Sequence, residues 1–284
     1  MILYFKKIKN ILSHKYFWKR FGVFFTTLFT LISFLFMFIE FEKGTKLFIA
    51  RICIYVLIFY LLTSLLYAFF ISKVRLSINN SILEIGVGDI FNEKSYKVIA
   101  FNEFFDTSFE NDLISPNTLN GKYLKMNYDN REKVKKLDEN IARNNALSKS
   151  ILDENVTRAD VGKNTRYKLG SIYKDEKYFL TAFSKFDEDN KAYLYMTDYV
   201  SFFMNFWNEV DRLYGGETVS LPLLGSGMTR TKDFIDVSPQ ELIEIIIWTF
   251  KISRVKFKHP SMVKIVIFPE DAKKINFYEL KEMG

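Results

Sequence analysis

Two long apolar runs near the start of the chain constrain its fold more than any other feature. Residues 21–39 and 52–71 contain no charged side chain, and the second run extends back to residue 47 across Arg51. Each run is close to the 20 or so helical residues that cross a bilayer core. A secretory signal would have a shorter apolar core and a small-residue cleavage site, whereas bulky side chains fill both runs. We therefore predict two transmembrane helices, at about residues 21–39 and 47–71.

The basic residues are concentrated around these spans. Of the 40 Lys and Arg residues, 11 lie in residues 1–75, together with only 2 of the 33 acids. Positively charged flanks remain cytoplasmic, so we expect a basic cytosolic segment over residues 1–20 and an outward loop near Gly44. The chain is then a multi-pass protein of the cell inner membrane with both termini cytoplasmic. Residues 76–284 are nearly neutral, which argues against nucleic acid as a partner.

The two runs carry no acid, Lys or Arg in mid-span, although a proton relay or conducting path normally needs such groups. Small and hydroxyl side chains such as Thr26, Thr30 and Ser64 allow helices to pack closely. We therefore expect a hairpin embedded in the lipid bilayer as an anchor or as part of an oligomer.

Metal and histidine chemistry have little support in the sequence. Cys53 is the single cysteine and lies in an apolar run, and the two histidines, His14 and His259, are far apart. No intrachain disulfide can form, and a zinc site of the usual ligand types is not expected.

Strand-like and helix-like patterns alternate after the spans, which predicts an α/β layer architecture. We treat residues 72–80 as a link, and residues 102–121 as a long loop that its phenylalanines keep ordered. Helix starts include a capping box at Ser238-Pro239-Gln240-Glu241. The expected strands are residues 81–85, 98–100, 165–172, 178–186, 217–224 and 264–268, and the expected helices include 128–144, 197–214 and 269–282.

A Gly-Ser-Gly turn follows the expected strand at residues 217–224. Glycines let the backbone take positive φ values, and successive N–H groups in such a turn can form an anion nest. A turn of this kind either holds a phosphate or is a tight turn without a ligand, and the residues alone leave both open. Asp89 and Asn102 also follow strands, and ligands of parallel sheets bind at the carboxyl ends of strands.

With these segments identified, residues 81–284 resemble a macro domain. Gly88-Asp89-Ile90 matches the segment whose Asp contacts the adenine amino group in that family. Residues 98–102 match the strand that leads into the loop around the distal ribose, and Gly225-Ser226-Gly227 matches the loop that wraps the diphosphate. The resemblance implies a three-layer α/β/α fold with a mixed central sheet, in a macro-like domain over residues 76–284.

The loop after Asn102 departs from the usual pattern of the family. Asn102-Glu103-Phe104-Phe105-Asp106 and Thr118-Leu119-Asn120-Gly121 replace the Asn-Ala-Ala-Asn run and the glycine-rich loop of ADP-ribose hydrolases. Hydrolytic residues therefore cannot be carried over. Together with the two spans, this variant loop looks like the membrane-anchored macro-domain effectors of Thoeris anti-phage defence.

That resemblance implies a sensor that is not an enzyme and has no cofactor. A TIR-domain partner would make the nucleotide signal, a histidine–ADP-ribose conjugate in the two-span form. Its binding would trigger homo-oligomerisation, membrane disruption and abortive infection. The residues expected to contact the ligand are Asp89, Ile90, Asn102, Glu103, Phe104, Phe105, Asp106, Thr118, Asn120, Gly121, Leu224, Gly225, Ser226, Gly227 and Met228.

Two alternative functions use the same residues. A membrane-anchored ADP-ribosyl hydrolase or NAD-metabolite hydrolase would need a base near the distal ribose, and Glu103, Asp106 and Asp112 are available. A structural anchor with an empty macro-like fold would bind no ADP-ribose derivative.

Overall fold

The computed structural model describes most of the 284 residues, and two compact units can be distinguished. One unit comprises the chain up to Val74 together with Asn276–Gly284, and the other comprises Arg75–Ile275. The predicted ligand contact Met228, and also His14, Asp112 and His259, lie outside the described residues. The described residues are 8–9, 11–13, 15–109, 113–158, 162–187, 189–227, 230–231, 237–258 and 261–284.

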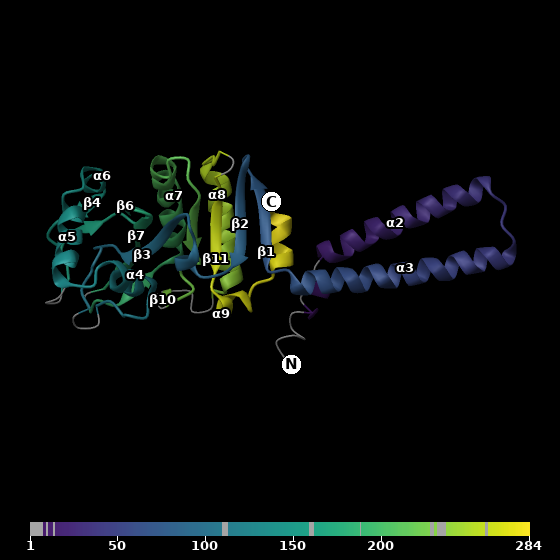
Figure 1. The fold of residues 1–284 in the computed structure, drawn as a ribbon, viewed down its shortest axis with the longest axis horizontal. Coiled ribbons are helices and arrows are strands. Elements are labelled where there is room, and N and C mark those ends of the chain that lie inside the picture. Colours follow the sequence, from purple (N-terminus) through teal and green to yellow (C-terminus); the bar gives the residue numbers. More distant parts are fainter. Residues whose placement is uncertain are drawn as a thin grey trace. The chain divides into compact units, whose positions relative to one another are not determined.

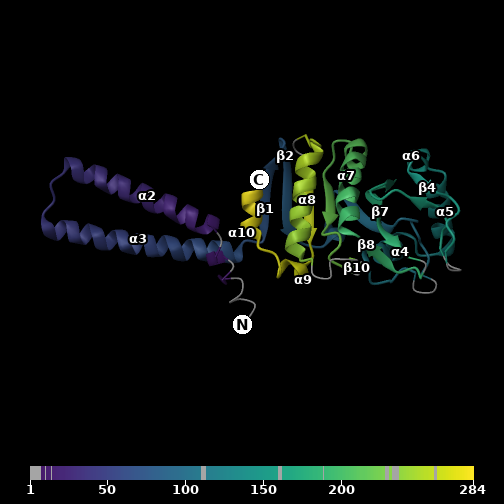
Figure 2. The ribbon, with the colours of Figure 1, turned by 180° about the vertical axis from the view of Figure 1, so that it is seen from behind.

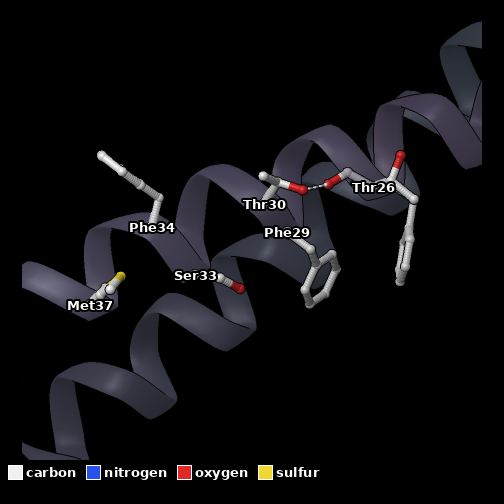
Figure 3. A pocket seen from close by; sticks show the side chains of 7 residues that line it. Thr26, Phe29, Thr30, Ser33, Phe34 and Met37 are labelled. Carbon is white, nitrogen blue, oxygen red and sulfur yellow. Dashed lines mark hydrogen bonds between the residues drawn. The ribbon is translucent and has the colours of Figure 1, made fainter.

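The first unit is built on a helical hairpin (Figure 1). Helices α2 (Lys15–Phe38) and α3 (Lys43–Phe70) are both long and apolar enough to cross a membrane, on length and composition. Phe24 of α2 stacks on Tyr60 of α3 with 3.9 Å between ring centroids. An exposed face of α2 carries Thr26, Thr30 and Ser33 among phenylalanines, and the Thr30 hydroxyl donates to the Thr26 carbonyl (Figure 3). The two predicted apolar runs are therefore helical, and each helix begins several residues earlier than its predicted span.

The end of the chain also belongs to the hairpin unit. We predicted a closing helix over residues 269–282, but the structure has α9 (Pro269–Ala272), α10 (Phe277–Leu280) and the 3₁₀ turn η3 (Lys281–Met283). Asn276 interrupts the helix because its side chain accepts a hydrogen bond from the Glu279 N–H and caps a new start. Residues 72–80, which we treated as the link, are therefore not the only stretch of chain that connects the two units.

The second unit contains a mixed sheet with the strand order β1-β2-β11-β9-β3-β7-β8-β10. Strands β2, β11, β9, β3 and β7 run parallel, while β6 and β8 pair antiparallel with β7. The bounds are β1 (Lys73–Ile78), β2 (Ser81–Val87), β3 (Tyr96–Asn102), β6 (Ile172–Asp175), β7 (Tyr178–Phe186), β8 (Ala192–Leu194), β9 (Val219–Pro222), β10 (Arg230–Thr231) and β11 (Val263–Ile267).

Two of the predicted segments fold differently from the expectation. Residues 72–80 contain β1, whose alternate side chains Val74, Leu76 and Ile78 are buried, so this segment is a sheet strand and not a free link. The expected strand 165–172 is divided at Gly170, where φ is +88° and a Cβ would lie 2.6 Å from the Phe202 carbonyl oxygen. Its first part, β5 (Arg166–Tyr167), pairs instead with β4 (Ile151–Asp153).

Helices cover both faces of the sheet, as the three-layer prediction requires. On one face, Ile99, Phe101 and Leu180 pack against the helices that follow β3. Helices α7 and α8 lie on the other face (Figure 2). There Phe183 packs on Phe202 of α7, and Trp207 of α7 packs on Phe250 of α8. The helices are α4 (Leu119–Asn127), α5 (Arg131–Ala142), α6 (Asn145–Ser148), α7 (Met196–Leu213) and α8 (Pro239–Ser253). The expected helix 128–144 corresponds to α5, which Asn130 caps.

Candidate functional site

Three of the predicted segments lie at one edge of the sheet. Strands β2, β9 and β3 are parallel, so Asp89, Gly225 and Asn102 all lie at or just beyond carboxyl ends. One strand, β11, separates β2 from β9, and β9 adjoins β3. Neighbouring strands are about 4.8 Å apart, so the strands before Asp89 and Gly225 are separated by roughly 10 Å, and β3 is about 5 Å further on.

The point between β9 and β3 is a topological switch. The connection from β3 leads through α4, α5 and α6 to β7, whereas the connection from β9 leads through α8 to β11 on the opposite side. Connections that diverge in this way leave a crevice outside the carboxyl ends, where ligands of open α/β sheets bind. The Gly225 turn and Asn102 flank this point.

Asp89 is presented by the end of β2. The Gly88 N–H donates to the Ile267 carbonyl at 2.9 Å, which fixes this end of β2 against β11. Asp89 is exposed and caps the 3₁₀ turn η1 (Ile90–Asn92), and its carboxylate accepts from the Phe91 N–H at 3.0 Å. Ile90 is buried. The Asp89 carboxylate is thus held in one orientation and remains open to a donor from solvent or a ligand.

A buried tyrosine hydroxyl supports the glycine turn by a hydrogen bond to its backbone. Gly225 has a φ of +90°, and the Ser226 hydroxyl donates to the Leu223 carbonyl at 2.9 Å. The buried Tyr199 hydroxyl donates to the Leu224 carbonyl at 2.8 Å. Burial raises the pKa of Tyr199, so this hydroxyl keeps its proton. Leu224 is itself buried, while Gly225 and Ser226 are half-buried and Gly227 is exposed.

Sequence reasoning missed Tyr199, although its position on the inner face of α7 was a usable signal. A Cβ at Gly225 would lie 3.2 Å from the Tyr199 ring, so the ring also limits this position to glycine. The turn is a backbone element with a fixed support, as an anion nest requires.

The Asn102 side chain forms hydrogen bonds with residues of the loop that follows it. Its side-chain oxygen accepts from the Phe104 N–H at 3.0 Å and from the Asp106 N–H at 3.2 Å, and its amide donates to the Asp106 carboxylate at 2.8 Å. Phe104 and Phe105 are buried, and Phe105 has a positive φ of +51°. These predicted ligand contacts are therefore engaged with the chain itself in this structure.

Arg158 is a site residue that sequence reasoning missed. It forms a two-point contact with Asp106, at 2.9 Å and 3.3 Å, and both side chains are almost fully buried. The guanidinium also lies 3.9 Å from the centre of the Phe104 ring and donates to Asn190 at 2.7 Å. No local pattern marks this pair, since its two partners are 52 positions apart.

Glu103 lies beside this network with a different partner. Its carboxylate is buried and accepts from the Phe186 N–H at 3.3 Å. Burial raises the pKa of Glu103, although this hydrogen bond and nearby cations oppose the shift. A carboxyl of this kind can exchange a proton closer to neutral pH than an exposed glutamate can.

Thr118, Asn120 and Gly121 lie at the start of α4. Thr118 caps that helix by accepting from the Gly121 N–H at 3.3 Å, so the loop expected to run to residue 121 ends at the cap. A Cβ at Gly121 would lie 2.3 Å from the Ser115 carbonyl oxygen, so this position needs glycine for packing. Among the residues that the structure describes, no group of three or more His, Cys, Asp or Glu could hold a metal ion.

Comparison with known proteins identifies the domain. Residues 83–268 match the family described as Thoeris protein ThsA, Macro domain. The chain is 42% identical over 259 residues to the Thoeris protein ThsA of Bacillus amyloliquefaciens (strain Y2). The aligned region covers 90% of this chain and 84% of that protein.

Solved macrodomain structures from Oceanobacillus iheyensis are more distant. A mutant with ADPR is 17% identical and covers 74% of this chain and 97% of that one, with a TM-score of 0.46. The same macrodomain with ADP is 18% identical over 74% of this chain and 95% of that one, with a TM-score of 0.45. The family match confirms the predicted macro-domain fold, and the chain belongs to the ThsA family of Thoeris proteins.

Proposed function

We propose that this protein is a membrane effector of anti-phage defence whose macro domain senses an ADP-ribose-derived signal. The observation that carries the proposal is the placement of Asp89, the Gly225 turn and Asn102 along one sheet edge, around the switch point between β9 and β3. Membership of the ThsA family supports the same role.

Each part of the ligand has a counterpart at this edge. The exposed Asp89 carboxylate accepts a hydrogen bond from the adenine amino group. The backbone N–H groups of residues 225–227 bind the diphosphate, because the positive φ of Gly225 turns the backbone so that successive donors can face an anion. The Ser226 N–H then gives up its long 3.5 Å hydrogen bond to the Leu223 carbonyl. The distal ribose and its substituent then lie toward the Asn102 loop, one strand further along the edge.

The signal comes from a TIR-domain partner, and in this two-span form it is a histidine–ADP-ribose conjugate. Both termini lie in the cytoplasm and the hairpin crosses the inner membrane, in agreement with the basic residues around α2 and α3. Ligand binding leads to homo-oligomerisation through the hairpin, membrane disruption and abortive infection, without catalysis.

A ligand changes a conformational equilibrium only by binding one state more tightly than the other. The loop of residues 102–106, the Asn102 loop, provides one of the two states that such a ligand would distinguish. In this state the polar groups of Asn102, Phe104 and Asp106 are hydrogen-bonded to one another. A ligand that takes over some of these hydrogen bonds stabilises a different loop arrangement, which is then available to form an interface.

Calorimetry on the detergent-solubilised full chain tests the proposal, with ADP-ribose and histidine–ADP-ribose as ligands. Asp89→Ala should weaken binding about tenfold or more, because a hydrogen bond to a charged acceptor is lost. Asp153→Ala, an exposed aspartate in the small β4–β5 sheet, is the control and should bind like the wild type. Wild-type affinity in Asp89→Ala would refute the placement of adenine.

A second candidate function is hydrolysis of an ADP-ribose derivative, and one observation favours it. Glu103 is a buried carboxyl with a raised pKa beside the proposed distal-ribose position, and perturbed acids are common at catalytic sites. Incubation of the full chain with the same ligands, followed by chromatography, separates the two functions. Multiple turnovers that Glu103→Gln abolishes would establish the hydrolase and contradict the sensor.

A further inference from the structure

A cavity at the base of the helical hairpin is lined mainly by polar side chains. It has a volume of about 330 Å³ and is formed by α2, α3 and one residue of α10. Cavities of roughly 300 Å³ and more are large enough for a small-molecule ligand. The polar residues that line it are Arg20, Tyr60, Thr63, Ser64, Tyr67 and Tyr278.

The proposed place of the hairpin in the membrane puts this cavity at the depth of lipid headgroups. Helix α3 has 28 residues, so its length of about 42 Å matches a bilayer together with its headgroup regions. Tyr67 then lies about 5 Å, and Ser64 about 9 Å, from the end of the helix at Phe70. Trp18 and Tyr67 are exposed at this end, and both residue types are enriched at membrane interfaces.

Two tyrosine hydroxyls in the cavity can donate to an anion. The Tyr67 hydroxyl accepts from the Lys281 ammonium at 3.0 Å, so its own proton remains available. Tyr278 is only 3% exposed, and its hydroxyl has no hydrogen-bond partner among the residues that the structure describes. Thr63, in contrast, donates to the Phe59 carbonyl of its own helix at 2.9 Å. Because a buried polar group without a partner costs free energy, the Tyr278 hydroxyl points to a missing acceptor.

The charges at the cavity do not balance. Arg20 lies 2.9 Å from the Glu282 carboxylate, and its guanidinium is 5.8 Å from the centre of the Tyr278 ring. A guanidinium has five N–H donors, so this single contact leaves others for a second anion. Lys281 adds a second cation at the Tyr67 hydroxyl. One phosphodiester, with a single negative charge, would neutralise the positive charge that Glu282 leaves.

Aromatic rings form the part of the cavity that lies deeper along the hairpin. The Phe21 and Tyr60 rings are 6.3 Å apart, and Tyr60 stacks on Phe24 at 3.9 Å. An apolar wall next to a cationic, hydroxyl-rich mouth matches a molecule with a charged group and acyl chains. Basic pockets between membrane helices bind anionic lipid headgroups in the same way.

We propose that this cavity binds the phosphate group of a phospholipid from the cytoplasmic leaflet, through Arg20 and the hydroxyls of Tyr67 and Tyr278. The acyl chains then lie along the Phe21 and Tyr60 side of the hairpin. A lipid in this position contacts both helices and the end of the chain at once. The inference goes beyond the proposed function and depends only on the membrane location that it gives to the hairpin.

Native mass spectrometry of the detergent-solubilised full chain, titrated with dioleoylphosphatidylglycerol, tests this proposal by measuring the affinity for a first bound lipid. Arg20→Gln should weaken that affinity about tenfold or more, because charge-assisted hydrogen bonds to the phosphate are lost. Lys19→Gln is the matched control, since Lys19 is the exposed neighbour on the same helix and does not line the cavity. It should bind like the wild type, and equal losses in the two variants would overturn the proposal.

Tyr278→Phe removes only the hydroxyl and keeps the packed ring. It should weaken lipid binding about tenfold, because one hydrogen bond to a charged group is lost. It should not lower the melting temperature of the lipid-free protein, since this hydroxyl has no partner within the described chain. Tyr16→Phe, at an exposed position of α2 outside the cavity, is the control and should leave binding unchanged. Wild-type lipid affinity in Tyr278→Phe would contradict the assigned contact.

Two further ligands identify what the cavity recognises. Dioleoylglycerol has the same acyl chains without the phosphate and should bind much more weakly than dioleoylphosphatidylglycerol. Inorganic phosphate should not displace the bound lipid, because it cannot use the apolar wall. Equal affinity for dioleoylglycerol would refute recognition of the phosphate, and displacement by inorganic phosphate would show a site for a free anion in place of a lipid.

Calorimetry with ADP-ribose on the same samples separates this inference from the proposed function. Lipid binding that depends on Arg20 and Tyr278, in a protein that does not bind ADP-ribose, would refute the sensor and leave the lipid site established. Normal ADP-ribose binding with lipid affinity that Arg20→Gln and Tyr278→Phe leave unchanged would refute only the lipid site.

Discussion

Replacing Gly225 with alanine should strain the proposed diphosphate-binding turn, and the loss of stability can be worked out from the geometry of the structure. Gly225 has a φ of +90°, and an added Cβ would lie 3.2 Å from the Tyr199 ring. Gly216 is a matched control, because its φ is +81° and an added Cβ would meet no atom within 4 Å. Gly216 lies in the turn before β9, at the other end of that strand from Gly225.

The two variants should differ in both stability and binding. Positive φ costs a residue with a side chain about 1–2 kcal/mol, so Gly216→Ala should lose that amount. Gly225→Ala adds a crowded contact with Tyr199 and should lose about 2–4 kcal/mol in total. In a domain of this size each kcal/mol lowers the melting temperature by about 2–4 °C.

Thermal denaturation and ADP-ribose calorimetry of the full chain in detergent measure both quantities. Gly225→Ala should bind at least about tenfold more weakly than the wild type, because the N–H groups that face the diphosphate are displaced. Gly216→Ala should bind normally despite its lower melting temperature. Normal binding by a destabilised Gly225→Ala would show that the turn does not hold the ligand, and unchanged melting would refute the strain argument.

Three further substitutions test the surroundings of the site, each measured by chemical denaturation. Asp106→Ala leaves the Arg158 guanidinium buried without its carboxylate and should cost about 3–5 kcal/mol, against less than about 1 kcal/mol for exposed Asp153→Ala; similar losses would contradict the buried pair. Burial raises the pKa of Glu103 above its usual value of 4.5, so above that pH the folded state retains a proton that the unfolded state releases, and wild-type stability falls as the pH rises from 4.5 through the raised pKa. Glu103→Gln should therefore gain stability relative to the wild type as the pH rises above 4.5, and a difference that is constant with pH would refute the raised pKa. Gly121→Ala places a Cβ 2.3 Å from a backbone oxygen and should cost about 1–3 kcal/mol, whereas an unchanged midpoint would show that α4 can shift freely.

The features that could be predicted from the sequence are those that local chemistry determines. The apolar runs became α2 and α3 because an uninterrupted apolar stretch of that length has few other stable conformations. The Ser238 capping box is present with both of its hydrogen bonds. The alternating strand-like and helix-like patterns predicted the α/β layers. The strand-like segments before Asp89 and Gly225 predicted that both residues follow a strand.

The features that were missed depend on partners distant in the chain. Nothing in the sequence near Asp106 indicates that Arg158 forms an ion pair with it. The sequence of a polar loop also does not show whether its side chains bind a ligand or form hydrogen bonds within the loop. The segment around β1 was treated as a link because it adjoins a span, although its alternating buried residues were visible. Residues 269–282 were predicted as one helix, since the contacts that Glu282 and Tyr278 make with Arg20 and Ala68 lie at the opposite end of the sequence.

The pairing of β2 with β11 has a consequence for biosynthesis. Leu83 lies opposite Val263 in this register. Strand β2 therefore cannot pair with β11 until almost all of the remaining chain has been synthesised. At about 5–20 residues per second, roughly 10–40 s of translation separate the completion of α3 from that of β11. Throughout that interval the hairpin lacks Tyr278, so the cluster that it forms with Ile11, Phe17 and Ala68 is completed only after β11 has been made.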